Sequence, residues 1–207
     1  MSDSSLSGRT FPRISGLPVA PSGDRASGWY GMLTVIATEG ALFSYLLFTY
    51  FYLGSQSANP WPPYGKLRLT IAASNTAILL ASSVAAWWGQ RGIERADQRQ
   101  LRIGLIVALL LGAVFVGLQV VEWSNKPFTL SSDAYGSLYF TVTGFHIAHV
   151  VVGLVILALL LVWSFLGYFS QERHLRVTIG IVYWHFVDAV WLCVFTTFYL
   201  TPYLGTP

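Results

Sequence analysis

The 207-residue sequence has few charged side chains: 12 Lys or Arg and 9 Asp or Glu, together 10% of the chain. Because an average soluble domain carries about 25% charged residues, this set cannot cover a water-facing surface unless most of the chain avoids water. Hydrophobic residues make up 54%, and the mean hydropathy is +0.57. These values exclude an ordinary soluble enzyme, a disordered regulator and a nucleic-acid binder, and they indicate an integral membrane protein.

Cysteine is also scarce. The single cysteine, Cys193, lies in an apolar run, so it supports neither a disulfide framework nor a thiolate metal site. The sequence contains no Walker motif, dinucleotide fingerprint or nucleophile elbow. Residues 1–27 are polar and rich in Ser, Gly and Pro. They lack the apolar core of a signal peptide, and we expect them to be disordered.

Five apolar runs reach the length of roughly 20 residues that a membrane-spanning helix needs. Each run is continuous and shows no alternation of polar and apolar residues, so we expect helices rather than strands. The predicted fold is an all-α integral membrane protein, a bundle of five transmembrane helices in one domain over residues 28–203. The predicted spans are residues 29–53, 69–88, 101–121, 135–163 and 178–200.

The distribution of cations predicts the orientation of this bundle. Nine Lys or Arg residues flank one side of the spans and three, Lys66, Arg68 and Lys126, flank the other. By the positive-inside rule, the N-terminus is cytoplasmic and the C-terminus lies outside. Aromatic residues near the span ends are expected to anchor them at the interfaces: Trp29, Tyr30, Trp87, Trp88, Trp123, Trp163, Tyr199 and Tyr203.

The outer loop between the first two spans has three prolines in four residues, within Asn59-Pro60-Trp61-Pro62-Pro63. Such a run is stiff and has few backbone donors. It predicts a rigid surface loop, with docking against a partner as the alternative.

Glu39 lies near the middle of the first predicted span. A charged side chain there costs about 2.5–3.5 kcal/mol on insertion scales. Two interpretations remain: a carboxyl that relays protons or contacts lipid, or a protonated acid hydrogen-bonded within the bundle.

Glu122, at the outer end of the third span, is expected to reach the interface. Asn75 and Gln119 are expected to link helices by hydrogen bonds.

Two pairs of polar residues have i, i+3 spacing, which places each pair on one helical face. They are His146 with His149, and His185 with Asp188. A metal centre could combine the three histidines with Glu39. However, the Glu-x-x-His pattern of diiron bundles is absent, so we favour a structural network of hydrogen bonds between helices.

Two longer motifs carry a family resemblance. Span 135–163 contains Tyr135-Gly136-Ser137, Thr143-Gly144-Phe145-His146-Ile147-Ala148-His149-Val150 and Gly153. It resembles the signature helix of subunit III of haem–copper cytochrome oxidases. In span 178–200, Tyr183-Trp184-His185-Phe186-Val187-Asp188-Ala189-Val190-Trp191 resembles the last helix of that family. Three shorter stretches follow the family's order: Glu39, Trp61-Pro62-Pro63 with Asn75-Thr76, and residues 119–122 before Pro127-Phe128-Thr129.

The resemblance implies the five-helix bacterial form of this subunit in the bacterial inner membrane. Longer members have seven helices, and the first two help to wall a lipid cleft. It implies an accessory subunit that binds phospholipid and supports proton uptake and the durability of subunit I. Its partners would be subunit I, subunit II, small subunits and a respiratory supercomplex. Haems and copper would belong to the partner subunits, with no metal in this chain. Cytochrome c oxidase is favoured over quinol oxidase.

The resemblance also implies roles for particular residues. It gives this chain no catalytic residue, and it gives Glu39 a role in proton uptake or lipid contact. It implies structural roles for His146, His149, His185 and Asp188. We add Arg173, His174 and Arg176 as contacts for lipid phosphates, because cations at the interface form charge-assisted bonds with phosphate.

Two other functions stay open on the sequence. One is a stand-alone membrane metalloprotein that uses the histidine pairs. The other is a small transporter with Glu39 as proton carrier, which usually requires an internal repeat that these spans do not show.

Overall fold

The computed structural model describes residues 27–171 and 173–204. The elements are α1 (Ser27–Gln56), α2 (Leu69–Glu94), α3 (Gln98–Ser124), α4 (Ala134–Phe165), α5 (Leu175–Phe195), the π-helical η1 (Thr196–Leu200) and α6 (Thr201–Leu204). Within these two ranges, five helical stretches are long and apolar enough to cross a membrane. The predicted all-α fold with five spans is therefore confirmed. The predicted disorder of the N-terminal segment falls, apart from Ser27, outside the described residues.

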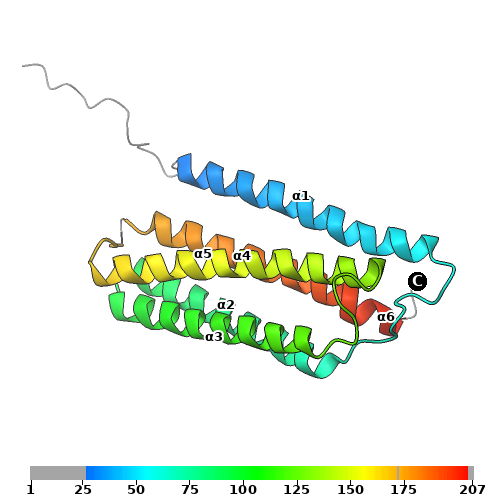
Figure 1. Cartoon of the computed structure of the whole chain (residues 1–207). Helices are drawn as coiled ribbons and strands as arrows, with labels where there is room; N and C mark the ends of the chain where they lie inside the picture. Colours follow the sequence, from blue (N-terminus) through cyan, green and yellow to red (C-terminus); the bar gives the residue numbers. More distant parts are fainter. Residues whose placement is uncertain (1–26, 172, 205–207) are drawn as a thin grey trace, which may run out of the picture.

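Successive long helices run in opposite directions, so α1 begins at one end of the bundle and α6 lies at the other (Figure 1). We call the end with α6 and the α1–α2 and α3–α4 loops the C-terminal end. The opposite, N-terminal end carries the α2–α3 turn and the α4–α5 loop. In that turn the Asp97 carboxylate accepts a hydrogen bond of 2.9 Å from the Gln100 backbone N–H and so caps α3.

Helices α2 and α3 form the most extensively packed pair of the bundle. A Cβ atom added to Gly104 of α3 would lie 2.6 Å from the Cα atom of Gly89 of α2. Since lipid offers no hydrophobic driving force between helices, close backbone approach through small residues supplies the packing energy.

Helix α5 is tied to α2 by two buried tryptophans. The indole N–H of Trp184 donates to the Ser82 hydroxyl at 3.1 Å, and that of Trp191 donates to the Thr76 hydroxyl at 2.9 Å. These tryptophans lie seven residues apart on one face of α5. The two bonds therefore fix both the rotation and the height of α5 against α2.

Helix α1 lies at the edge of the bundle, where it contacts α4 and α5 (Figure 1). Only 6% of its most apolar stretch is buried, compared with 56% for the stretch that contains α5. Most of the surface of α1 is therefore not covered by the rest of the bundle and can contact lipid or another protein.

At its C-terminal end α5 widens into the π-helical η1, just before Pro202. A proline has no N–H and its ring collides with the carbonyl four residues earlier. One extra residue per turn relieves that collision, and it rotates Phe198 and Tyr199 into the core, where both are fully buried.

Candidate functional site

Glu39 and His149 form a pair between α1 and α4. The Glu39 Oε2 atom lies 3.1 Å from Nε2 of His149, and the side chains are 34% and 16% exposed. The other ring nitrogen, Nδ1, donates to the backbone carbonyl of Phe145 at 2.7 Å, because a carbonyl can only accept. One proton is therefore shared between Nε2 and Oε2, whether the pair is a neutral acid with imidazole or a carboxylate with imidazolium.

This pair lines a groove of about 380 Å³ between α1, α4 and α5. The other walls are mainly apolar, and they are formed by Met32, Val35, Ala148, Val152, Ile156 and Tyr183. The ring of Phe43 stands edge-on to His149, with 5.1 Å between ring centroids. A narrow apolar groove with one polar pair suits an acyl chain better than a polar substrate.

His146, one turn earlier on α4, is fully buried in an aromatic cluster. Its ring centroid lies 5.0 Å from that of Trp191 and 5.9 Å from that of Phe115. Among the described residues neither ring nitrogen has a hydrogen-bond partner. His146 and His149 therefore point into different surroundings, although their i, i+3 spacing places them on neighbouring positions of the helix.

His185 and Asp188 lie on the side of α5 that faces α2. The Nδ1 atom of His185 contacts the Ser83 hydroxyl and lies 3.9 Å from the Asp188 carboxylate. Asp188 is 5% exposed, whereas the His185 side chain is 39% exposed and lines a shallow hollow beside Trp87. Among the described residues, no hydrogen bond joins this cluster to His146 or His149.

The metal centre that the spacing allowed on paper is not assembled. It needs His146, His149, His185 and Glu39 around one point. No group of three or more His, Cys, Asp or Glu side chains is placed to hold a metal ion within the described part of the chain. The four residues are divided between the groove, the aromatic core and the α2–α5 face.

A polar cluster at the C-terminal end was not expected. Glu122 is 3% exposed, so the prediction that it reaches the interface is wrong. Its Oε1 atom lies 2.8 Å from the Lys126 ammonium and accepts a bond of 2.6 Å from the Tyr199 hydroxyl, which lies 2.8 Å from the Tyr139 hydroxyl. Tyr199 is likewise buried, not an interfacial anchor. In the sequence, the i, i+4 spacing of Glu122 and Lys126 is the feature that could have predicted their ion pair.

The family model of cytochrome c oxidase subunit III matches residues 25–203. The chain is 36% identical over 178 residues to cytochrome c oxidase subunit 3 of Myxine glutinosa, which covers 82% of this chain and 68% of that protein. The corresponding proteins of Danio rerio and Salmo salar are 36% and 37% identical over 179 residues, with the same coverage. The chain belongs to the cytochrome c oxidase subunit III family.

Membership makes this subunit III protein a component of a respiratory oxidase complex and a multi-pass membrane protein. The two longest motifs lie on α4 and α5, and they meet where Trp184 packs against Gly153 and Trp191 packs against His146. Asn75 and Gln119 link α2 to α3 as predicted, with 3.3 Å between Nδ2 and Oε1.

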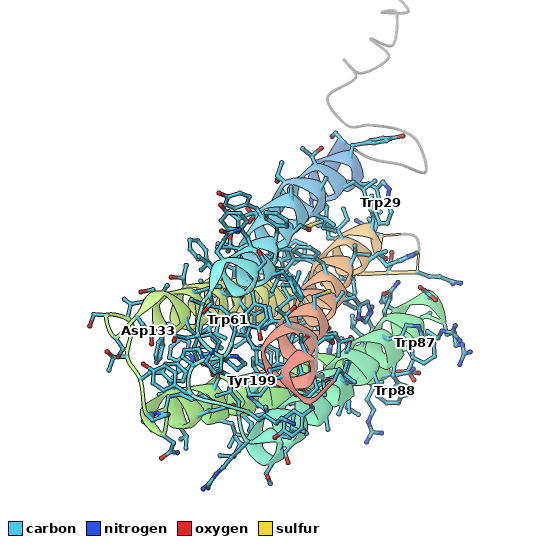
Figure 2. The ribbon with its side chains drawn as sticks, turned by 90° about the vertical axis from the view of Figure 1, so that its right-hand side faces the viewer. Trp29, Trp61, Trp87, Trp88, Asp133 and Tyr199 are labelled. Carbon is cyan, nitrogen blue, oxygen red and sulfur yellow. The ribbon has the colours of Figure 1, made fainter. Side chains whose placement is uncertain are left out.

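The proline-rich loop of the subunit III protein folds back onto the bundle. Trp61 packs edge-on against Tyr50 and Tyr135, at centroid distances of 5.7 and 5.3 Å. The Tyr64 hydroxyl donates to the Asp133 carboxylate at 2.6 Å, and this bond raises the pKa of Tyr64. Figure 2 looks onto the C-terminal end of the bundle, with Trp61 and Tyr199 toward the centre of the view and Trp87 and Trp88 at its edge. These contacts attach the loop to the bundle; its rigidity and its docking to a partner stay predictions.

The three residues expected to bind lipid phosphate, Arg173, His174 and Arg176, lie at the N-terminal end where α5 begins. Both arginines are exposed. The Arg176 guanidinium lies 5.9 Å from the ring centroid of Trp163, an arrangement that holds the cation near the interface. Their role toward lipid stays a prediction.

Proposed function

We propose that the chain is the accessory subunit III of an aerobic cytochrome c oxidase that reduces oxygen to water and pumps protons. In this proposal it packs on subunit I, holds phospholipid and supports proton uptake and sustained turnover. The haems and copper reside in the partner subunits. The observation that carries the proposal is the Glu39–His149 pair on the wall of an apolar groove.

The pair suits proton handling because it exchanges a proton internally. A proton that moves from Oε2 to Nε2 over 3.1 Å converts a neutral pair into an ion pair, and a second proton can then enter the freed carboxylate. The neutral pair and the ion pair both keep the hydrogen bond and carry no net charge, whereas the form that holds the second proton carries one net positive charge, which is costly in hydrocarbon.

The same groove suits a phospholipid tail. Its lining is apolar apart from the pair and the Tyr183 side chain. The residues Met32, Val35 and Glu39 lie in the half of α1 that begins at the N-terminal end. Arg173 and Arg176, which lie at that end, supply cations for the phosphate.

The exposure of His185 supports the proposal that this face packs against another subunit. An imidazole that is 39% exposed on a membrane-spanning helix is costly when it faces lipid. A transmembrane helix of a neighbouring subunit that covers the hollow beside Trp87 and offers the imidazole a hydrogen-bond partner would lower this cost. We further place the complex in a bacterial cytoplasmic membrane, with the more cationic N-terminal end inside.

The experiment uses the purified oxidase complex with Glu39→Gln in this subunit, and Glu94→Gln as the control. Glu94 is an exposed acid at the end of α2. We expect Glu39→Gln to leave the initial rate of electron transfer within about twofold of the wild type, and to lower proton pumping or the number of turnovers before inactivation. The control should change neither. Wild-type pumping and lifetime in Glu39→Gln would leave Glu39 a structural role only.

A further inference from the structure

We infer that the C-terminal end of the bundle carries a separate binding site for the headgroup of an anionic phospholipid. The site is a cavity of about 610 Å³ between the start of α2 and the end of α3. It lies at the opposite end from Arg173, His174 and Arg176. The site is independent of the proposed role of Glu39.

The charge of the cavity favours an anion. All three cations of this end, Lys66, Arg68 and Lys126, line the cavity. Glu122 is the only acid among its lining residues in the described part of the chain, and it is already paired with Lys126 at 2.8 Å. Lys66 and Arg68 have no ion-pair partner among the described residues, so two cations remain for a ligand.

The chemistry of these two cations also suits a phosphate. Both side chains are exposed and come from the short segment that leads into α2. Lys66 is held over the ring of Tyr203, with its ammonium 4.9 Å from the centroid. The guanidinium of an arginine can bind two phosphate oxygens at once, while an ammonium adds a point charge. The exposed Asn125 is also in the lining; its amide nitrogen donates one N–H to the Val121 carbonyl at 2.9 Å, which leaves the second N–H for a ligand.

The apolar part of the lining favours a lipid over a free anion. Ile71, in the first turn of α2, is 37% exposed and lines the cavity. Ile78 follows seven residues later on the same face of the helix. A headgroup bound by Lys66 and Arg68 would therefore lie above Ile71 and Ile78, with the Ser74 hydroxyl between them bonded back to the Thr70 carbonyl. A free phosphate would leave these isoleucines unused.

The test uses the whole oxidase complex, stripped of loosely bound lipid in detergent and titrated with phosphatidylglycerol. Native mass spectrometry counts the lipids bound per complex. The double variant Lys66→Gln/Arg68→Gln removes both exposed cations. Each cation near a charged lipid surface contributes roughly fivefold in affinity, so we expect one lipid to bind about 25-fold more weakly. Raising the ionic strength should weaken the wild type in the same direction.

The matched control is Arg95→Gln/Arg99→Gln, which removes two exposed cations at the N-terminal end. It should keep the lipid that the first variant loses. Equal loss in both variants, or no loss in Lys66→Gln/Arg68→Gln, would overturn the proposal. A competition with inorganic phosphate distinguishes a lipid headgroup from free phosphate as the ligand. If phosphate displaces the lipid at a similar concentration, the site binds free anions and the lipid assignment is overturned.

Discussion

The Nε2 atom of His149 on α4 lies 3.1 Å from the Oε2 atom of Glu39 on α1, although 110 residues separate them in the chain. The backbone carbonyl of Phe145 fixes the other ring nitrogen of His149 as a donor. This leaves Nε2 to share a proton with the carboxyl group, and the contact joins the loosely packed α1 to the rest of the bundle.

The two residues should act as one unit. We expect His149→Gln to shorten the turnover lifetime of the oxidase complex as much as Glu39→Gln does, because either change removes the shared proton. The double variant should be no worse than the single ones. Lifetimes measured as oxygen consumed before inactivation would give this comparison. Additive losses would show that the two side chains act independently.

Gly153 should be needed for the packing of Trp184. A Cβ atom at Gly153 would lie 2.7 Å from Cε3 of this buried indole, whereas a Cβ at Gly144 on the same helix meets nothing within 4 Å. We expect Gly153→Ala to destabilise the subunit by about 1–3 kcal/mol through overpacking. Gly144→Ala should be neutral, or more stable by up to ~1 kcal/mol from helix propensity. Thermal unfolding in detergent compares the two, and equal melting would contradict the packing.

The buried pair of Glu122 and Lys126 should be sensitive to the loss of either partner. We expect Lys126→Met to destabilise the subunit by roughly 3–5 kcal/mol, because it leaves a buried carboxyl without its cation. The double variant Glu122→Gln/Lys126→Met should recover much of this loss. Chemical unfolding of the purified complex measures both. A Lys126→Met variant as stable as the wild type would contradict a buried ion pair between Glu122 and Lys126.

Tyr64 should lose its bond to Asp133 at high pH. The bond raises the pKa of Tyr64 above the ordinary value of 10.0. Its stabilisation is therefore fully present below pH 10 and disappears as the pH rises through the raised pKa. The difference in near-ultraviolet absorbance between the wild type and Tyr64→Phe follows this titration. Asp133→Asn should move it toward 10.0; an unchanged midpoint would contradict the contact.

The five spans could be predicted because bilayer thickness alone sets the length of an apolar run. The partner of Glu39 could not, since it depends on how α1 is rotated against α4, and nothing in the local sequence fixes that rotation. The position of Glu122 along its helix also led to a wrong prediction, namely that its carboxyl reaches the interface. It lies near a span end, where a carboxyl normally meets water, but Lys126 and Tyr199 fold over it.

The contacts of the histidines likewise depend on packing between helices. Equal i, i+3 spacing suggested that His146 and His149 act together, yet only His149 reaches Glu39. The packing of Trp191 against His146, at 5.0 Å between ring centroids, comes from another helix and decides the difference.

The central claim is that this chain is an accessory subunit of a cytochrome c oxidase. Its most direct test is purification of the tagged chain from native membranes, with identification and optical spectroscopy of the proteins that accompany it. We predict a haem-bearing subunit I and a subunit II with a copper-A centre, and no stoichiometric iron or copper in the separated chain. A chain that purifies without them and carries its own stoichiometric iron or copper would contradict the account.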